Sequence, residues 1–247
     1  MTVTRISMGQ ELECRANDVV ARLRECPFYG RLMAGELNQE EYAAWLVQMY
    51  RWIRHAIRGL RGHADAMLAR SLRDPRQKPF AVGADRHAEE EVGHDTMILD
   101  DLAALWGCSR TEVLGRIEQE EAAPSTMEWE RLLDGLLARN PTCFPGIAVA
   151  METLSGSTVD EIVRNMRASS PIPGIEQALT FLVHHSSEVE EGHVGSAAMR
   201  LDALQSPVER SAAYYYGAAS LAMFEAMHHY LAERFPAPAL ELAGAGA

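Results

Sequence analysis

The chain has 247 residues, of which 47% are hydrophobic and 23% charged, as in an ordinary water-soluble globular protein. Its formal net charge of −12 excludes nucleic acid as an expected partner, because phosphate binding requires clustered lysines and arginines. We find no segment typical of a signal peptide and no apolar run of about 18 residues, so we expect a cytoplasmic protein that does not cross a membrane.

Helical periodicity dominates the chain, and we find no stretch with the alternation typical of strands. Proline-containing breakers separate the periodic segments at 74–79, 140–145 and 169–174. These signals predict helices, in chain order, at 9–24, 38–72, 80–106, 110–122, 125–139, 146–155, 158–168, 174–205 and 207–234. Capping-box patterns mark four of the starts, at Asn38/Glu41, Ser109/Glu112, Ser125/Glu128 and Ser206/Glu209.

No linker is long or polar enough to divide the chain, so we predict one helical domain over residues 1–235. The segment 236–247 is rich in proline, alanine and glycine and is expected to be a disordered tail. The predicted fold class is therefore all-α, a bundle of about seven to nine helices.

The first candidate site lies in the predicted helix 80–106. Side chains three or four positions apart share a helix face, so His87, Glu91 and His94 are expected to point the same way, with Glu90 at the edge of that face. Glu-x-x-His on a bundle helix is typical of di-iron carboxylate proteins, and imidazole with carboxylate suits iron or manganese. The alternative is a solvated acidic face, because one such motif is short and common.

The second candidate site lies in the predicted helix 174–205, where Glu190 and His193 repeat the Glu-x-x-His spacing. His185 precedes His193 by two turns and lies about 80° away around the helix, so it reaches the same site only if the helix is locally distorted. His184 is expected to face nearly opposite. The alternative is again a charged surface helix, although two such clusters support each other.

The third element is Glu152, a lone carboxylate in the apolar segment 146–155. An uncompensated buried carboxylate is costly, so Glu152 is expected to be paired, protonated or bound to a metal. A structural salt bridge is the alternative. The three elements together offer the donors that two irons require: Glu91, His94, Glu152, His185, Glu190 and His193.

The cysteines are scattered and form no Cys-x-x-Cys pair, which disfavours both a zinc framework and a disulfide scaffold. Cys143, between two prolines, is a candidate nucleophile, but no base is evident beside it. Several methionines on the helices, such as Met49 and Met151, are expected in the core rather than along a lipid tunnel.

The segment Cys26-Pro-Phe-Tyr-Gly-Arg-Leu-Met-Ala-Gly-Glu-Leu37 and the stretch 38–50 after it resemble the opening of the TenA/PqqC superfamily, which has the heme oxygenase fold. The segment 87–102, which ends in Asp-Asp-Leu, resembles the second core helix of the heme-oxygenase-like di-iron oxidases and oxygenases. The order of features is also similar: a Glu/His helix, a lone Glu about fifty to sixty residues later, and an acid-x-x-His helix about forty beyond. The resemblance covers most of the chain.

The resemblance implies metal ligation by Glu91, His94, Glu152, Glu190 and His193. One departure concerns the last helix, where the family's pattern is His-x-x-x-Asp-x-x-His and this chain has Ser186 and Glu190 at the first two of those positions. Either His185 supplies the missing nitrogen through a bulge in the helix, or the second metal is weakly held, or the site binds one metal or none.

The implied function is that of a non-haem di-iron, O₂-dependent oxidase or oxygenase in natural-product biosynthesis. Glu91, Glu152 and Glu190 would be its catalytic carboxylates, two irons and O₂ its cofactors, and an amine, amino acid or fatty acid its substrate. Family members carry out N-oxygenation, oxidative C–C cleavage or desaturation, and related folds often form homodimers. One alternative is a metal-independent TenA- or PqqC-like enzyme, and another is a non-catalytic helical protein that binds a metal or ligand.

Overall fold

The computed structural model of the chain describes residues 6–185 and 187–237, with only the backbone described over 187–193. Helices and the turns between them make up this part of the chain, and it contains no strand. The predicted all-α class is therefore confirmed. Residues 238–247, where a disordered tail was predicted, lie outside the described residues.

The helices are more numerous than predicted, because two long segments are each divided and the short helix α2 was not expected. None of the described helices is both long and apolar enough to cross a membrane. The α-helices of the described residues are α1 (Met8–Glu25), α2 (Pro27–Ala34), α3 (Gln39–Arg73), α4 (Lys78–Glu90), α5 (His94–Trp106), α6 (Arg110–Gln119), α7 (Pro124–Arg139), α8 (Pro145–Gly156), α9 (Val159–Ser169), α10 (Thr180–His184), α11 (Ser187–Asp202) and α12 (Pro207–Arg234). Three 3₁₀ turns join them: η1 (Pro75–Gln77), η2 (Pro141–Cys143) and η3 (Ile175–Ala178).

Side-chain caps fix several helix starts as the sequence predicts. Asn38 and Ser109 each complete a capping box, and Ser206 accepts a hydrogen bond from the backbone N–H of Glu209. The box predicted at Ser125 and Glu128 is wrong. Helix α7 begins one residue earlier at Pro124, whose fixed φ and missing N–H suit the first helical position, so Ser125 lies inside the first turn.

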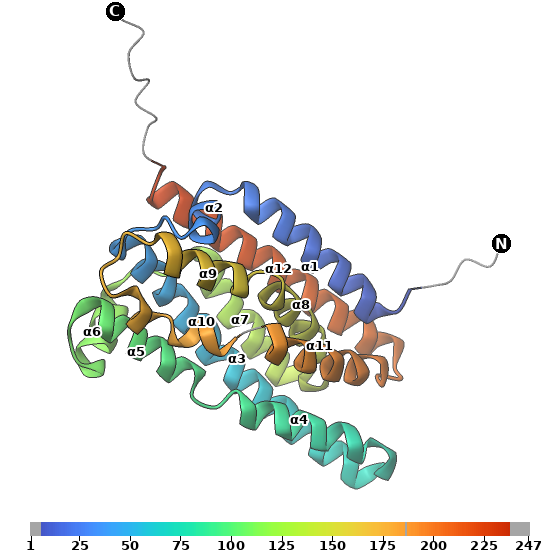
Figure 1. Cartoon of the computed structure of the whole chain (residues 1–247). Helices are drawn as coiled ribbons and strands as arrows, with labels where there is room; N and C mark the ends of the chain where they lie inside the picture. The colour runs from blue at the N-terminus through green and yellow to red at the C-terminus, as the bar shows by residue number, and fades with distance from the viewer. Residues whose placement is uncertain (1–5, 186, 238–247) are drawn as a thin grey trace, which may run out of the picture.

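The bundle is organised around two long helices, α3 and α12 (Figure 1). Helix α3 packs against α4, α5 and α7, while α8 packs against α1, α11 and α12. Aromatic side chains join the two groups: the rings of Trp52 and Trp129 stack 4.3 Å apart, and Phe224 meets Trp52 edge-on at 5.4 Å. Such pairs stabilise a core beyond the area they bury, so this contact holds α3, α7 and α12 together.

Glycines allow α8 and α12 to touch through their backbones. A Cβ added at Gly146 would overlap the carbonyl oxygen of Ala213, and one added at Gly217 would overlap the carbonyl oxygen of Gly146. Only the missing side chains permit this approach, because the obstructing atoms are backbone and cannot rotate away. The contact fixes the position of α8, which carries Glu152.

A buried histidine makes the stability of the bundle depend on pH. His228 is fully buried, accepts a hydrogen bond at Nε2 from the indole N–H of Trp45 (3.1 Å) and donates one from Nδ1 to the carbonyl of Phe224 (2.9 Å). Burial lowers the pKa of His228 to about 3, whereas an unfolded histidine titrates near 6.5. The unfolded chain therefore takes up the proton first as the pH falls.

We expect the free energy of unfolding to fall from about pH 6.5 toward pH 3, by about 1.4 kcal/mol per pH unit from His228 at full slope. Urea unfolding at pH 7, 6 and 5 measures the slope. In His228→Gln, whose amide oxygen replaces the acceptor for Trp45, the slope should flatten even if the variant is less stable at pH 7. An unchanged slope in that variant would contradict the assignment to His228.

Candidate metal centre

The predicted helix 80–106 is broken at the centre of its Glu/His motif. Helix α4 ends at Glu90 and α5 begins at His94, with Gly93 between them at a φ of 98°. Glycine adopts this left-handed conformation at little cost, which permits the break. The two expected ligands stay together across it, since His94 Nδ1 lies 2.6 Å from a carboxylate oxygen of Glu91.

The predicted helix 174–205 is also broken, at its histidine pair. Helix α10 ends at His184, His185 leaves the helical conformation, and α11 resumes at Ser187. This is the local distortion that His185 needs in order to reach the site. Its ring lies 4.5 Å from that of His94, and its Nδ1 is 2.9 Å from the carbonyl of Phe181. A Nδ1–H donated to that carbonyl leaves Nε2 with a lone pair for a ligand.

Glu91, His94 and His185 form a group that could hold a metal ion. Each contributes one donor atom, and the three atoms lie within 4.8 Å of one another. His94 is buried, and its Nε2 has no hydrogen-bond partner among the described residues. An unsatisfied buried nitrogen costs free energy and needs an explanation. A metal ion beside it would accept its lone pair, so these residues fit the group that the resemblance implies.

Glu152, on α8, lies in the same region and contacts His87 there. Its Oε1 lies 3.0 Å from His87 Nε2, and Glu91 Oε1 lies 3.9 Å from the same nitrogen. The other ring nitrogen of His87 is 2.9 Å from the guanidinium of Arg200. Because a guanidinium only donates, His87 accepts at Nδ1 and presents Nε2–H to Glu152. Glu152 is thus paired, as expected for a carboxylate in an apolar helix. Its partner is the N–H of a histidine whose pKa is lowered to about 4, which makes the contact a hydrogen bond rather than a salt bridge.

Arg200 is the residue at this site that the sequence analysis missed. Its side chain is buried, and burial lowers the pKa of its guanidinium while Glu152 opposes that shift. Arg200 follows His193 by seven positions, which is two turns of α11 and the same helix face. That spacing was the available signal, but a buried arginine is too rare to be expected from one sequence.

The electrostatic environment favours the neutral forms of His87 and His185 and the ionised form of Glu91. Burial, with Arg200 nearby, lowers the pKa of His87 to about 4, and burial, with His94 nearby, lowers the pKa of His185 to about 4. Burial by itself raises the pKa of Glu91, but the bond to His94 and the surrounding imidazoles lower it to about 2. Neutral imidazole and ionised carboxylate are the forms that bind a metal.

The expectation for His184 is corrected. Its ring does not face away, since it lies 4.8 Å from that of His94, because α10 ends at this point. Glu90 is exposed and lies 3.5 Å from Arg86, and Asp95 accepts the backbone N–H of Thr96. The Phe181 carbonyl orients His185, and Arg200 orients His87. The side chains of Ser186, Glu190 and His193 lie outside the described residues.

A cavity of about 130 Å³ adjoins the group. Its lining includes His87, Glu91, Glu152 and His185 and is otherwise largely apolar and aromatic. Met49 and Met151, expected in the core, are among the residues that line it. The arrangement therefore places an apolar chamber beside carboxylate and imidazole donors.

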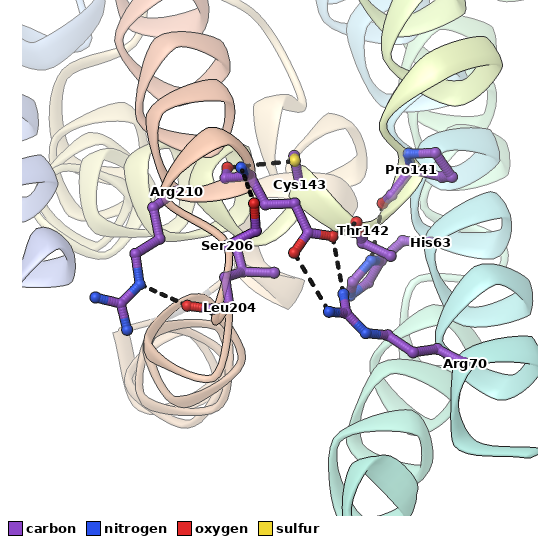
Figure 2. A network of polar contacts seen from close by, with 9 residues as sticks. His63, Arg70, Pro141, Thr142, Cys143, Leu204, Ser206 and Arg210 are labelled. Atoms are coloured by element: carbon purple, nitrogen blue, oxygen red, sulfur yellow. Dashed lines mark hydrogen bonds and ion pairs between the residues drawn. The ribbon is translucent and has the colours of Figure 1, made fainter. Parts of the chain in front are cut away.

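Cys143 belongs to a different network and does not line the cavity. Its thiol is fully buried and donates to the backbone carbonyl of Glu209 at 3.4 Å, and burial raises its pKa to about 11. The carboxylate of Glu209 meanwhile binds Arg70 and Thr142 (Figure 2). A thiol held protonated in this way is a poor nucleophile. Its role is to join η2 to α12, so the structure does not support the cysteine-based alternative.

No protein-family model matches the chain, and no curated protein matches its sequence. Solved structures do match over nearly the whole length. A domain of unknown function with a heme oxygenase-like fold from Shewanella denitrificans superposes with a TM-score of 0.72 at 18% identity, covering 94% of each chain. A TenA homolog from Pseudomonas syringae gives 0.73 at 12% identity, covering 92% of this chain and 93% of that one. The heme oxygenase of Leptospira interrogans gives 0.63 at 12%, covering 91% and 100%.

The chain has a heme oxygenase-like fold. The fold that the resemblance implies is thereby confirmed. Identities this low establish the heme oxygenase-like fold alone, and different chemistries occupy one fold, so the activity must be argued from the Glu91, His94 and His185 group and its surroundings.

Proposed function

We propose that the protein is an O₂-dependent non-haem iron oxidase or oxygenase that acts on a small organic substrate. The observation that carries the proposal is the convergence of Glu91, His94 and His185 at two helix breaks, with a buried His94 nitrogen that no described protein group satisfies. A solvated acidic face would not bury these groups against a cavity.

The residues that would hold a first iron are Glu91, His94 and His185. Glu152 would serve a second iron, together with Glu190 and His193, whose side chains lie outside the described residues. Bound iron would supply the activation of O₂ and the oxidising power, which protein side chains lack. The expected reaction is one of those that the resemblance to heme-oxygenase-like di-iron oxidases implies: N-oxygenation, oxidative C–C cleavage or desaturation.

The chain's own residues prepare this site. The carbonyl of Phe181 fixes the ring of His185, and Arg200 sets the hydrogen of His87 so that it meets Glu152. Orientation of this kind raises metal affinity, because the ligands need not be ordered when the metal arrives. The apolar cavity excludes water and holds the substrate against the carboxylates.

Anaerobic titration of the metal-free protein with Fe(II), followed by exposure to O₂ and Mössbauer spectroscopy, tests the proposal. We expect about two irons per chain and a magnetically coupled ferric pair. One iron per chain would indicate that the second site is incomplete, and Ser186→His should then raise the number. No bound iron would overturn the proposal, and iron bound without O₂ consumption across candidate substrates would indicate a metal-binding protein. Cys143→Ser should leave the stoichiometry unchanged.

A further inference from the structure

The walls of the cavity offer an apolar surface to a ligand, even where the lining side chains carry polar atoms. Three tryptophans line it, and each indole N–H is already engaged: Trp45 with His228, Trp52 with Thr126 Oγ1, and Trp129 with the carbonyl of Trp52. Phe144, Phe181 and Phe224 add further ring surface. A ligand therefore meets aromatic faces and edges, which favour another ring over a hydrogen-bonding group.

Charge is confined to one group within the lining. Among the described residues, no lysine or arginine borders the cavity. The titratable groups that border the cavity are the imidazoles and carboxylates of the candidate metal centre and the hydroxyl of Tyr29. Burial raises the pKa of that hydroxyl to about 12. The Glu91 carboxylate lies against His94, and that of Glu152 lies against His87. A charged group in the apolar part of the cavity would lose its hydration without gaining a partner.

The size of the cavity limits the ligand further. Its volume is about 130 Å³. An apolar protein cavity of about 150 Å³ holds one benzene, whereas pockets for larger organic ligands measure about 300 Å³ or more. The volume is therefore close to that of a single six-membered ring and well below that of pockets for larger ligands such as a long acyl chain.

We propose that the substrate is small and uncharged at the part that enters the cavity, and that this part is a benzene-sized ring. The inference rests on the proposed function and names its substrate class: it selects an aromatic ring over the fatty acids and free amino acids that the resemblance implies. The ring lies among Trp45, Trp52 and Trp129, and the atom to be oxidised faces Glu91 and Glu152.

The test uses the full chain after chelation of metal, so that ring binding is measured independently of iron. The probes are fluorobenzene, 4-fluorobenzoate and 4-fluorobenzylamine, which share one ring and differ in charge, followed by ¹⁹F NMR. We expect fluorobenzene to bind at least about tenfold more tightly than either charged probe. Decanoate, as a fatty acid, should displace fluorobenzene only at high concentrations, where decanoate also binds unrelated control proteins non-specifically.

Two matched alanine variants locate the bound ring. Ala56 lines the cavity and Ala212 does not, and both are partly buried helical residues. Ala56→Leu should weaken fluorobenzene binding at least about tenfold, and Ala212→Leu should leave it within about twofold. If circular dichroism shows that Ala56→Leu does not fold, Ala148→Val takes its place, since Ala148 on α8 also lines the cavity.

Equal effects of the two leucine variants, tighter binding of a charged probe, or displacement by low concentrations of decanoate would each overturn the inference. Failure of iron binding with fluorobenzene still bound would overturn the proposed function and leave the ligand class standing. Iron binding without fluorobenzene binding would overturn the ligand class and leave the proposed function in place.

Discussion

Replacing His94 with alanine is expected to abolish iron binding by the Glu91, His94 and His185 group while the helical bundle stays folded. The substitution removes the buried nitrogen that has no partner among the described residues, and it leaves only two donors of the group. Loss of the ring also removes one partner of Glu91, which should cost about 1–3 kcal/mol of stability. Iron stoichiometry and far-ultraviolet circular dichroism measure the two effects separately.

His229→Ala provides the matched control, because His229 is an exposed histidine on α12. Its removal should change neither iron content nor stability beyond about 0.5 kcal/mol. Full iron loading of folded His94→Ala would show that the metal lies elsewhere, and the proposed function would then lose the observation that carries it.

Gly146→Ala is expected to be among the most damaging single-methyl changes in the protein. The added Cβ would overlap the carbonyl of Ala213, and neither α8 nor α12 can yield without moving a whole helix. We expect a loss of about 3–5 kcal/mol in the free energy of unfolding, or failure to fold. Thermal and urea denaturation measure the loss.

Gly135→Ala is the control for helix propensity. Gly135 lies within α7, and a Cβ there meets no atom within 4 Å. The same methyl group should therefore be neutral or stabilise by up to about 1 kcal/mol, because alanine is the better helix former. If Gly146→Ala proved as mild, the backbone contact between α8 and α12 would not determine their packing.

Sequence reasoning located most of the helices because caps and breakers are local signals. Asn38 and Ser109 mark helix starts through their own hydrogen bonds, so no knowledge of the rest of the fold was needed. The breaks at Gly93 and His185 were harder to predict. Each lies inside a periodic segment, and a single glycine or histidine there does not end a helix by itself. Packing across the site decides those breaks.

The composition of the candidate site was predicted better than its connections. Glu91, His94, Glu152 and His185 do gather in one region, whereas the pairing of Glu152 with His87 depends on Arg200. That arginine is distant from both in sequence, and no local pattern predicts burial of its charge. Whether Glu190 and His193 join them stays a prediction.

The buried guanidinium of Arg200 also affects the metal binding that we propose. It offsets part of the negative charge that Glu91 and Glu152 would otherwise concentrate in the interior, and it orients the N–H of His87 that pairs with Glu152. In the proposed function, the pairing of His87 with Glu152 would give way when a metal binds Glu152. The affinity for a second iron would then depend on how readily the neighbouring Arg200 accepts another cation beside it.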